Sequence, residues 1–347
     1  MTTSQPERRR RVTQQDIARM TGVSQATVSL VLNGRAEADA RIAPETRDRV
    51  LRAIQETGYV ADPIARRLAA RHNRILGVFT YEPVFPAANS DFYYPFLVGI
   101  EERAEALGCD LLLLTSSPVA DGRRRIFHQD NRLRLADGCV LLGRSLDRDE
   151  LTRLVGEGYP FVSVGRRDDA GGPVPYVGAD YPAAVAALTR RAVDLGHTRL
   201  AYLGQGGGPE SYADRMRGFA KTATAAGAMT RHEPAGDLGR SLDAMLAAGV
   251  TALFVEEYAD AVALLGIAAE QGLSVPDDLS IVTLGDPTRP TSPPAVEFTG
   301  FRIPRQQMGA EVIDVLMALV EGHPTDSQRL LACDLVAGAT LAPPRAE

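Results

Sequence analysis

The sequence lacks the long apolar runs that membrane-spanning proteins need. No segment approaches the roughly 20 consecutive apolar residues that cross a bilayer. The first dozen residues, which include four consecutive arginines, contain no apolar stretch of the kind found in a secretory signal peptide. We therefore expect the protein to stay in the cytoplasm.

Cysteine and histidine are also scarce. Cys109, Cys139 and Cys333 are far apart, and none belongs to a CxxC motif. This spacing predicts neither a disulfide framework nor a zinc site, so buried thiols are the simpler expectation. The five histidines are scattered, and no nucleophile or acid–base pair can be located. We therefore expect no metal, no cofactor and no catalytic activity.

Positive charge is concentrated at the N-terminus. Residues 1–74 hold 14 arginines and 8 acidic residues, a net charge of +6, whereas the rest of the 347-residue chain carries a net charge of −12. A basic arm on an acidic body suits a segment that faces nucleic-acid phosphate. The length, with 45% hydrophobic residues, exceeds one ordinary core and indicates two or three compact units.

The N-terminal segment begins with a predicted helix-turn-helix. Thr13 and Asp16 have the spacing of a capping box, and the helix that they begin would carry Ile17 and Met20 inward and stop at Gly22. A second helix over Ser24–Leu32, capped by its serine, would follow at once. Two short helices joined by a tight glycine-containing turn are typical of this motif.

The second and third helices supply the predicted core of this segment. Within Ser24–Leu32, the residues Val28, Val31 and Leu32 share one face, and the small Ala18 would allow the first two helices to cross. The third helix has Pro44 early in its first turn and Gly58 at its end, and its predicted buried stripe is Val50, Leu51 and Ile54. A small three-helix bundle without a DNA-binding role is the alternative interpretation.

The residues themselves favour the DNA-binding interpretation. The segments VTQQDIARMTGVSQATVSLVLNGR, PETRDRVLRAIQETGYV and PIARRLAARHNRILGV closely resemble the headpiece and hinge of the lac/gal repressor family. This resemblance implies a sequence-specific transcriptional regulator, in most members a repressor, that binds near-palindromic double-stranded operator DNA as a homodimer and so associates with the nucleoid. It also implies a DNA-binding headpiece over residues 1–60, a hinge helix and linker over 61–74, and an effector-binding and dimerisation body over 75–347.

The resemblance assigns DNA contacts residue by residue. Gln25 and Ala26 match the start of the recognition helix, which reads base edges in the major groove, and a glutamine amide can bond bidentately to adenine. Leu30 matches a third reading position, which is often polar in relatives. The remaining headpiece positions implied to bind DNA, most of them through the phosphate backbone, are Thr13, Gln14, Ser24, Thr27, Ser29, Asn33, Thr46 and Tyr59.

The hinge is a short basic segment. Pro63–Ala70 resembles the helix that folds on DNA in the family, and Leu68 matches the leucine that enters the minor groove as an apolar wedge. Arg66 is placed near the phosphate backbone by the same resemblance. Ala61-Asp62 stand where relatives commonly have Pro-Asn, which changes the residues available to cap this helix.

From Ile75 onward, short apolar runs alternate with amphipathic stretches, which indicates parallel α/β sheets covered on both faces. The expected strands are Ile75–Thr80, Leu111–Thr115, Gly138–Leu142 and Phe161–Val164 in a first lobe, and Leu200–Leu203, Ala252–Val255 and Ser280–Leu284 in a second. The expected helices are Pro95–Leu107, Tyr181–Leu195, Ser211–Ala226, Asp260–Gln271 and Arg305–Glu321. Strand ends and loops of two such lobes can surround a ligand in the cleft between them.

The family resemblance continues through the body. The segments RRAVDLGHTRLAYLG, DRMRGF, GLSVPDDLSIVTLGD and LVAGATLAPP imply a periplasmic-binding-protein-like (type I) α/β fold that binds an effector. Arg215 matches the arginine that usually reaches the effector. Glu257 and Tyr258 replace a common Asn-Asp pair, and Asp286 follows a glycine that stands where an effector-binding Asp is frequent. Gly165 likewise replaces a frequent Asp.

Aromatic residues add to the candidate effector site. Tyr81, Phe92, Tyr93 and Tyr94 follow the first strand, and we expect the first three to line the cleft, where aromatic rings can stack on a ligand. Packing at the lobe edge or in the dimer interface is the equal alternative. With Arg215 as donor and the two acids as acceptors, the expected effector is a sugar or sugar-like molecule.

Two other classes of protein compete with the regulator. A dehydrogenase or sugar kinase would share the α/β body, but the glycine-rich segment 204–209 ends in Pro209 and is not followed by lysine, so it fits neither nucleotide-binding motif and indicates a cleft loop. An exported solute-binding protein would share the two lobes, but the basic headpiece and the absence of a signal peptide count against it.

Overall fold

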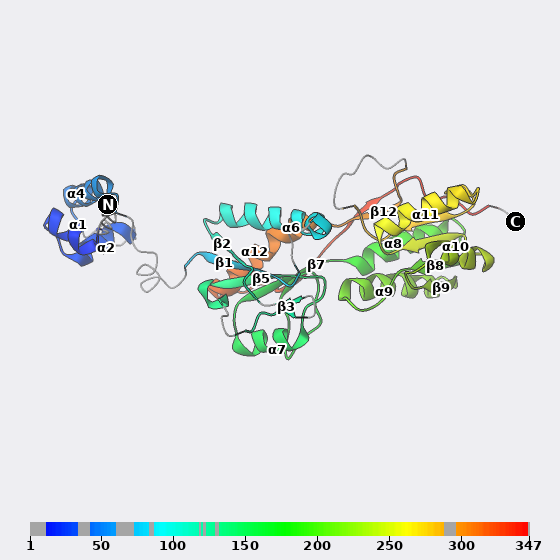
Figure 1. Ribbon diagram of the computed structural model, residues 1–347, viewed down its shortest axis with the longest axis horizontal. Coiled ribbons are helices and arrows are strands. Elements are labelled where there is room, and N and C mark those ends of the chain that lie inside the picture. Colours follow the sequence, from blue (N-terminus) through cyan, green and yellow to red (C-terminus); the bar gives the residue numbers. More distant parts are fainter. Residues whose placement is uncertain are drawn as a thin grey trace, which may run out of the picture. The chain divides into compact units, whose positions relative to one another are not determined.

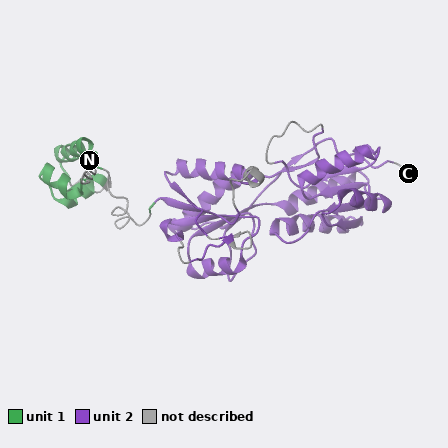
Figure 2. Cartoon of the chain, viewed as in Figure 1, with its two compact units in different colours: residues 1–73 green, residues 74–347 purple. Residues whose placement is uncertain are grey.

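The computed structural model describes residues 12–33, 42–59, 73–82, 87–117, 119–120, 123–128, 132–287 and 296–345. The chain divides into two compact units, residues 1–73 and residues 74–347 (Figure 2). The predicted hinge, with Arg66 and Leu68, lies outside the described residues. Its role therefore stays a prediction.

The first unit contains the three predicted helices, which are α1 (Gln14–Thr21), α2 (Gln25–Asn33) and α4 (Pro44–Thr57) (Figure 1). The capping box of α1 is confirmed: Asp16 N donates to Thr13 Oγ1, and Thr13 N donates to Asp16 Oδ2 at 3.0 Å. Gly22 ends α1 in the left-handed conformation, with φ of 67°. The helix-turn-helix is therefore present, and local capping fixes its boundaries.

The core of this unit is small. Ile17, Val28 and Val50 are completely buried, and Ala18 lies with them. Ala18 is therefore part of the core that the three helices share.

Two core predictions for this unit were wrong. Met20 is 60% exposed and Leu51 is 41% exposed. The buried stripe of α1 continues from Ile17 to Thr21, one turn on, and leaves position 20 at its flank. In α4 the stripe is centred on Val50 and Ala53, so that Leu51 faces solvent.

The second unit contains two parallel sheets (Figure 1). The first lobe has a six-stranded sheet in the order β13-β7-β6-β5-β1-β2, with strands β1 (Ile75–Thr80), β2 (Asp110–Leu114), β5 (Gly138–Leu142), β6 (Phe161–Val164), β7 (Tyr176–Ala179) and β13 (Gln328–Leu331). Its helices are α6 (Ala87–Ala106), α7 (Arg148–Glu157) and α12 (Arg305–Glu321). Helices α6 and α12 share one apolar core on one face of the sheet, and α7 packs on the other face.

The second lobe has a four-stranded sheet in the order β11-β10-β8-β9, with strands β8 (Arg199–Leu203), β9 (Met229–Glu233), β10 (Ala252–Val255) and β11 (Ser280–Thr283). Its helices are α8 (Tyr181–Asp194), α9 (Glu210–Ala225), α10 (Leu238–Ala247) and α11 (Tyr258–Glu270). Helices α8 and α9 pack together, whereas α10 and α11 share a separate core. Short elements complete the unit: β3 (Val119–Ala120), β4 (Arg123–Arg124), a 3-10 turn (Leu133–Leu135), β12 (Gly300–Arg302) and β14 (Asp334–Val336).

The chain passes between the lobes near residues 180, 303 and 333. The first lobe is therefore completed by α12 and β13, which come from the C-terminal part of the chain. The strands β12 and β14, which flank these returning segments, pair antiparallel. None of the helices in the described part of the chain is both long and apolar enough to cross a membrane.

The seven strands and five helices predicted for the body are confirmed, five of them with the predicted bounds and the others with shifted ends. The largest shift is in α6, which begins at Ala87 and contains Pro95, whereas the sequence placed this proline at the helix start. Strands β7, β9 and β13 and helices α7 and α10 were not predicted.

Candidate functional site

The first unit presents the start of α2 as an exposed polar surface. Thr27 N donates to Ser24 Oγ at 3.1 Å, so Ser24 caps the helix as predicted. Gln25 and Ala26, in the first turn, are exposed, and Leu30 follows one turn later at 42% exposed. The predicted reading positions therefore lie on one accessible stretch of a short, capped helix.

The predicted backbone-contact residues lie on all three helices and at their ends. Gln14 Oε1 lies 3.5 Å from Gln25 Nε2, so these two predicted contacts are neighbours. Thr13, Ser24 and Thr27 make local capping bonds. Ser29 and Thr46 are half-buried, and Tyr59 packs against the small core. Asn33 is the last residue of α2.

The second unit encloses a cavity of about 530 Å³ between its two sheets. Many of the lining residues come directly after strands. Examples are Arg144 after β5, Arg166 after β6, Glu257 after β10 and Gly285 after β11. The carboxyl ends of parallel strands are where α/β proteins bind ligands. A volume of this size lies within the range of about 300–1,000 Å³ found for small-molecule sites.

Aromatic rings form a large part of the cavity wall. The aromatic lining residues are Phe92, Tyr93, Phe96, Tyr181, Tyr212 and Tyr258. Phe92, Tyr93 and Tyr258 thus lie where the sequence placed them. The prediction for Tyr81 was wrong: this ring is 1% exposed and packs edge to face against Phe79, at 5.0 Å, in the core beneath α7. Alternate positions along a strand face the same side, so Tyr81 follows Phe79 away from the cavity.

Arg215 lies in the cavity wall and is held rigidly. Its Nε donates to the carbonyl of Leu284 at 2.6 Å, and its Nη1 donates to the carbonyl of Ser211 at 3.0 Å. The guanidinium stacks over the ring of Tyr181, with 3.9 Å from Cζ to the ring centroid. Nη2 makes no hydrogen bond to the described residues, so its N–H groups remain for a ligand.

The predicted acidic residues line the same cavity. Glu257 Oε1 accepts from the Tyr212 hydroxyl at 2.7 Å. Burial and this hydrogen bond raise the pKa of Tyr212 to about 12, so the hydroxyl stays protonated. Asp286 Oδ1 accepts from Arg305 Nη1 at 2.9 Å, and the ion pair neutralises its charge. Glu257 therefore offers acceptor oxygens, whereas Asp286 is already paired.

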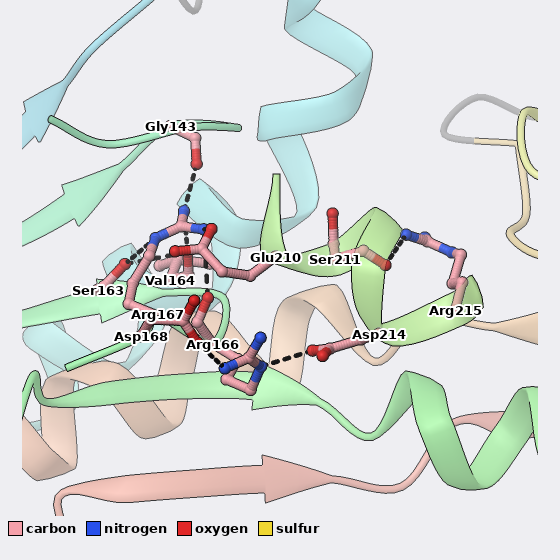
Figure 3. Close-up of polar contacts among 10 residues, drawn as sticks. All are labelled: Gly143, Ser163, Val164, Arg166, Arg167, Asp168, Glu210, Ser211, Asp214 and Arg215. Carbon is pink, nitrogen blue, oxygen red and sulfur yellow. Dashed lines mark hydrogen bonds and ion pairs between the residues drawn. The ribbon is translucent and has the colours of Figure 1, made fainter. Parts of the chain in front are cut away.

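Several cavity residues were missed from the sequence. Arg144, Arg166 and Arg167 line the wall, and the last two make ion pairs with acidic residues of α9 (Figure 3). Their positions directly after Gly138–Leu142 and Phe161–Val164 are the signal that could have found them.

A glycine-rich loop follows β8 and ends at the cavity wall. Gln205 N donates to Glu256 Oε2 at 2.6 Å, and the Tyr202 hydroxyl donates to Glu256 Oε1 at 2.6 Å. Gly204 has φ of 153°, and a Cβ there would lie 2.4 Å from Glu256 Cβ. Only glycine can occupy this position after β8. Close packing against Glu256 therefore explains the first glycine of the segment that resembles a nucleotide-binding motif. Pro209, at the end of the loop, lines the cavity.

Two protein families match the chain, one in each unit. Residues 13–62 match the family described as bacterial regulatory proteins, lacI family. Residues 189–341 match the periplasmic binding protein-like domain. The first match covers the helix-turn-helix, and the second covers most of the second lobe with α12 and β13.

Similar proteins cover almost the whole chain. The HTH-type transcriptional regulator CelR of Thermobifida fusca is 31% identical, over 94% of this chain and 96% of that protein. Catabolite control protein A of Priestia megaterium is 26% identical, over 91% of this chain and 95% of its own.

Solved structures agree with these relatives. A lac repressor dimer bound to operator and the anti-inducer ONPF has a TM-score of 0.74 at 23% identity, covering 96% of this chain and 100% of that chain. A complex of the transcriptional regulator CelR with cellobiose has a TM-score of 0.60 at 26% identity, covering 95% and 100%.

Proposed function

The chain belongs to the lacI family of bacterial transcriptional regulators, and we propose that it binds a near-palindromic operator as a homodimer whose affinity changes when a small molecule fills the cavity. Similarity to CelR along almost the full length supports regulation of transcription rather than catalysis. The capped α2, with Gln25 and Ala26 exposed, fits a recognition helix in the major groove. Binding to chromosomal DNA would place the protein at the nucleoid.

The proposal of a small-molecule effector rests on the cavity, because the chemistry of its wall fits a neutral, hydroxyl-rich ligand. Ion pairs already occupy three of the five arginines in the wall, Arg166, Arg167 and Arg305, so an anionic ligand would have to compete with existing carboxylates there. Arg215 Nη2 can donate to a ligand hydroxyl and Glu257 can accept from one. Aromatic rings in the wall can cover the apolar face of a sugar ring. A sugar is the molecule that meets these conditions together.

The size of the cavity and one relative sharpen the ligand class. The similar protein CelR is described in complex with cellobiose, a neutral disaccharide. A cavity of about 530 Å³ has room for a ligand of that size. We therefore propose a neutral mono- or disaccharide as the effector.

Differential scanning fluorimetry tests the ligand class. The panel contains neutral mono- and disaccharides including cellobiose, sugar phosphates, nucleobases and amino acids. A sugar at a concentration of one hundred times its Kd should stabilise the folded protein by about 2.7 kcal/mol and raise the Tm by roughly 5–10 °C. A rise in Tm with a purine or an amino acid, while every sugar is silent, would overturn the ligand class.

The hinge gives a separate prediction, which rests on the family resemblance of Pro63–Ala70. Leu68→Ala should leave the dimer and effector binding intact, lower operator affinity and reduce the bend in the DNA, because the apolar wedge is lost. Arg66→Ala is the matched control, since loss of a phosphate contact should weaken binding and reduce the salt dependence without reducing the bend. Gel-phasing assays measure the bend. Equal bending by Leu68→Ala and the unmodified protein would show that Leu68 only packs.

A further inference from the structure

Two ion pairs connect the lobes beside the cavity. Arg166 Nε donates to Asp214 Oδ2 at 2.6 Å, and Arg167 Nη1 donates to Glu210 Oε2 at 3.0 Å. Both arginines follow β6 in the first lobe, and both carboxylates belong to α9 in the second (Figure 3). Water has little access, because the Arg167 side chain is 4% exposed and that of Asp214 is 1% exposed.

Arg167 has no hydrogen-bond donor left for a ligand. A guanidinium carries five N–H groups. Besides Glu210, the acceptors of Arg167 are Ser163 Oγ at 3.1 Å and the carbonyls of Arg166, Gly143 and Val164 at 3.2, 2.6 and 3.3 Å. Four of these five acceptors belong to the first lobe, and Glu210 is the single one from the second lobe. Arg167 is therefore built into the first lobe and reaches across to α9.

Helix α9 brings this contact together with the ligand-facing groups. Glu210 is the first residue of α9, where the helix dipole favours an acidic side chain. Tyr212 and Arg215, farther along the same helix, line the cavity. The ion pairs at one end of α9 thus fix the position of the Arg215 side chain relative to the first lobe.

We propose that the pairs Arg166–Asp214 and Arg167–Glu210 form a lobe clasp, which holds the cleft closed and makes these four residues positioning residues for the effector. A ligand held between closed lobes binds with an apparent affinity proportional to the closed fraction. Loss of the clasp should therefore weaken binding of the effector, although Arg215 and the aromatic wall would still present the same groups to it. The expected change in effector affinity rests on the proposed function, whereas the closure of the cleft by the clasp does not.

The opening of the cleft can be measured without a ligand. Spin labels at Gly156→Cys on α7 and Ala247→Cys on α10 report the distance between lobes, since both positions are exposed. Cys333→Ser removes the least buried native thiol. We expect one narrow distance distribution in the otherwise unmodified chain and an added longer component in the double variant Glu210→Gln/Asp214→Asn.

Two control variants separate clasping from general loss of charge. Asp168→Asn removes an ion pair of the same Arg166 within the first lobe, and Arg217→Gln removes one of the same Asp214 within α9. Both should keep the narrow distribution. Glu210→Gln alone serves where the double variant does not fold, because Glu210 is the more exposed carboxylate, at 21% against 1% for Asp214. An unchanged distribution in every Glu210 variant that folds would overturn the clasp.

The sugar found in the panel supplies a second readout. If the closed fraction falls to roughly a tenth, the apparent affinity of Glu210→Gln, a change outside the cavity wall, should fall about tenfold, with no loss in the two controls. Silence of the whole panel would count against the proposed function and leave the distance measurement to decide the clasp. A sugar that binds every variant equally would remove the clasp from effector binding and leave the proposed function standing.

Discussion

Replacing Arg215 by alanine is expected to abolish the influence of the effector on operator binding while leaving effector-free operator affinity near normal. The guanidinium lies in the cavity wall, 7% exposed, with Nη2 unused by the described residues. Its planar donors suit vicinal hydroxyls, and the charge cannot be lost at working pH. Operator binding measured with and without the effector tests this expectation. A variant that still responds would remove Arg215 from the site.

The design of the Arg215 experiment must separate lost ligand contact from a loosened lobe. Alanine also removes the side-chain donor from the carbonyls of Leu284 and Ser211. Arg215→Lys keeps the charge but not the planar fork, so it should also lose the response. Arg217→Ala, two positions along α9 and outside the cavity wall, is the matched control and should respond normally. Thermal unfolding of all three variants shows whether the second lobe is intact.

Replacing Gln25 by alanine should change which base is preferred at one operator position. Gln25 is exposed in the first turn of α2, where a side-chain amide can pair bidentately with adenine. Loss of such a contact costs about 1–3 kcal/mol, which corresponds to roughly fivefold to 150-fold in discrimination at that position. Sequencing of DNA fragments selected by the purified protein measures the change.

Thr27 provides the comparison for Gln25. It is half-buried and bonded to Ser24, so Thr27→Ala should weaken binding similarly for all sequences. An unchanged sequence preference in Gln25→Ala, with a changed preference in Thr27→Ala, would reverse the assignment of reading and positioning roles.

The elements that the sequence analysis recognised are those with strong local signals. Strands β5 and β10 are continuous apolar runs, β6 is interrupted only by Ser163, and all three are fully buried. In contrast, β9 has the sequence MTRHE and is largely exposed at the edge of its sheet. Backbone pairing with β8 holds β9 in the sheet, whereas its side chains give no apolar pattern that predicts a strand. The strand β13 pairs with β7, where Gln328 lies opposite Tyr176, so its partner is far away in sequence and no local pattern could place it.

The candidate site shows the same division. Arg215 and Glu257 were found because their motifs resemble those of a known family. Arg167 and Glu210 were not found, because they become partners only when a strand end of one lobe meets a helix start of the other. Tyr81 was misplaced because it follows Phe79 to the face of the sheet that packs under α7, whereas Phe92 lies on α6 at the cavity.

The late return of the chain to the first lobe determines the order in which the protein can be completed during synthesis. Residues 75–179 leave the ribosome early, yet their sheet receives α12 and β13 only from residues 305–331. Until then, the apolar face of α6 with Phe96 and Ile100 has no partner helix, although both residues are buried in the finished protein. The sheet of the second lobe comes from the continuous stretch 199–283 and can form first. Nascent chains shorter than about 305 residues therefore expose this apolar face of α6, to which chaperones and proteases can bind.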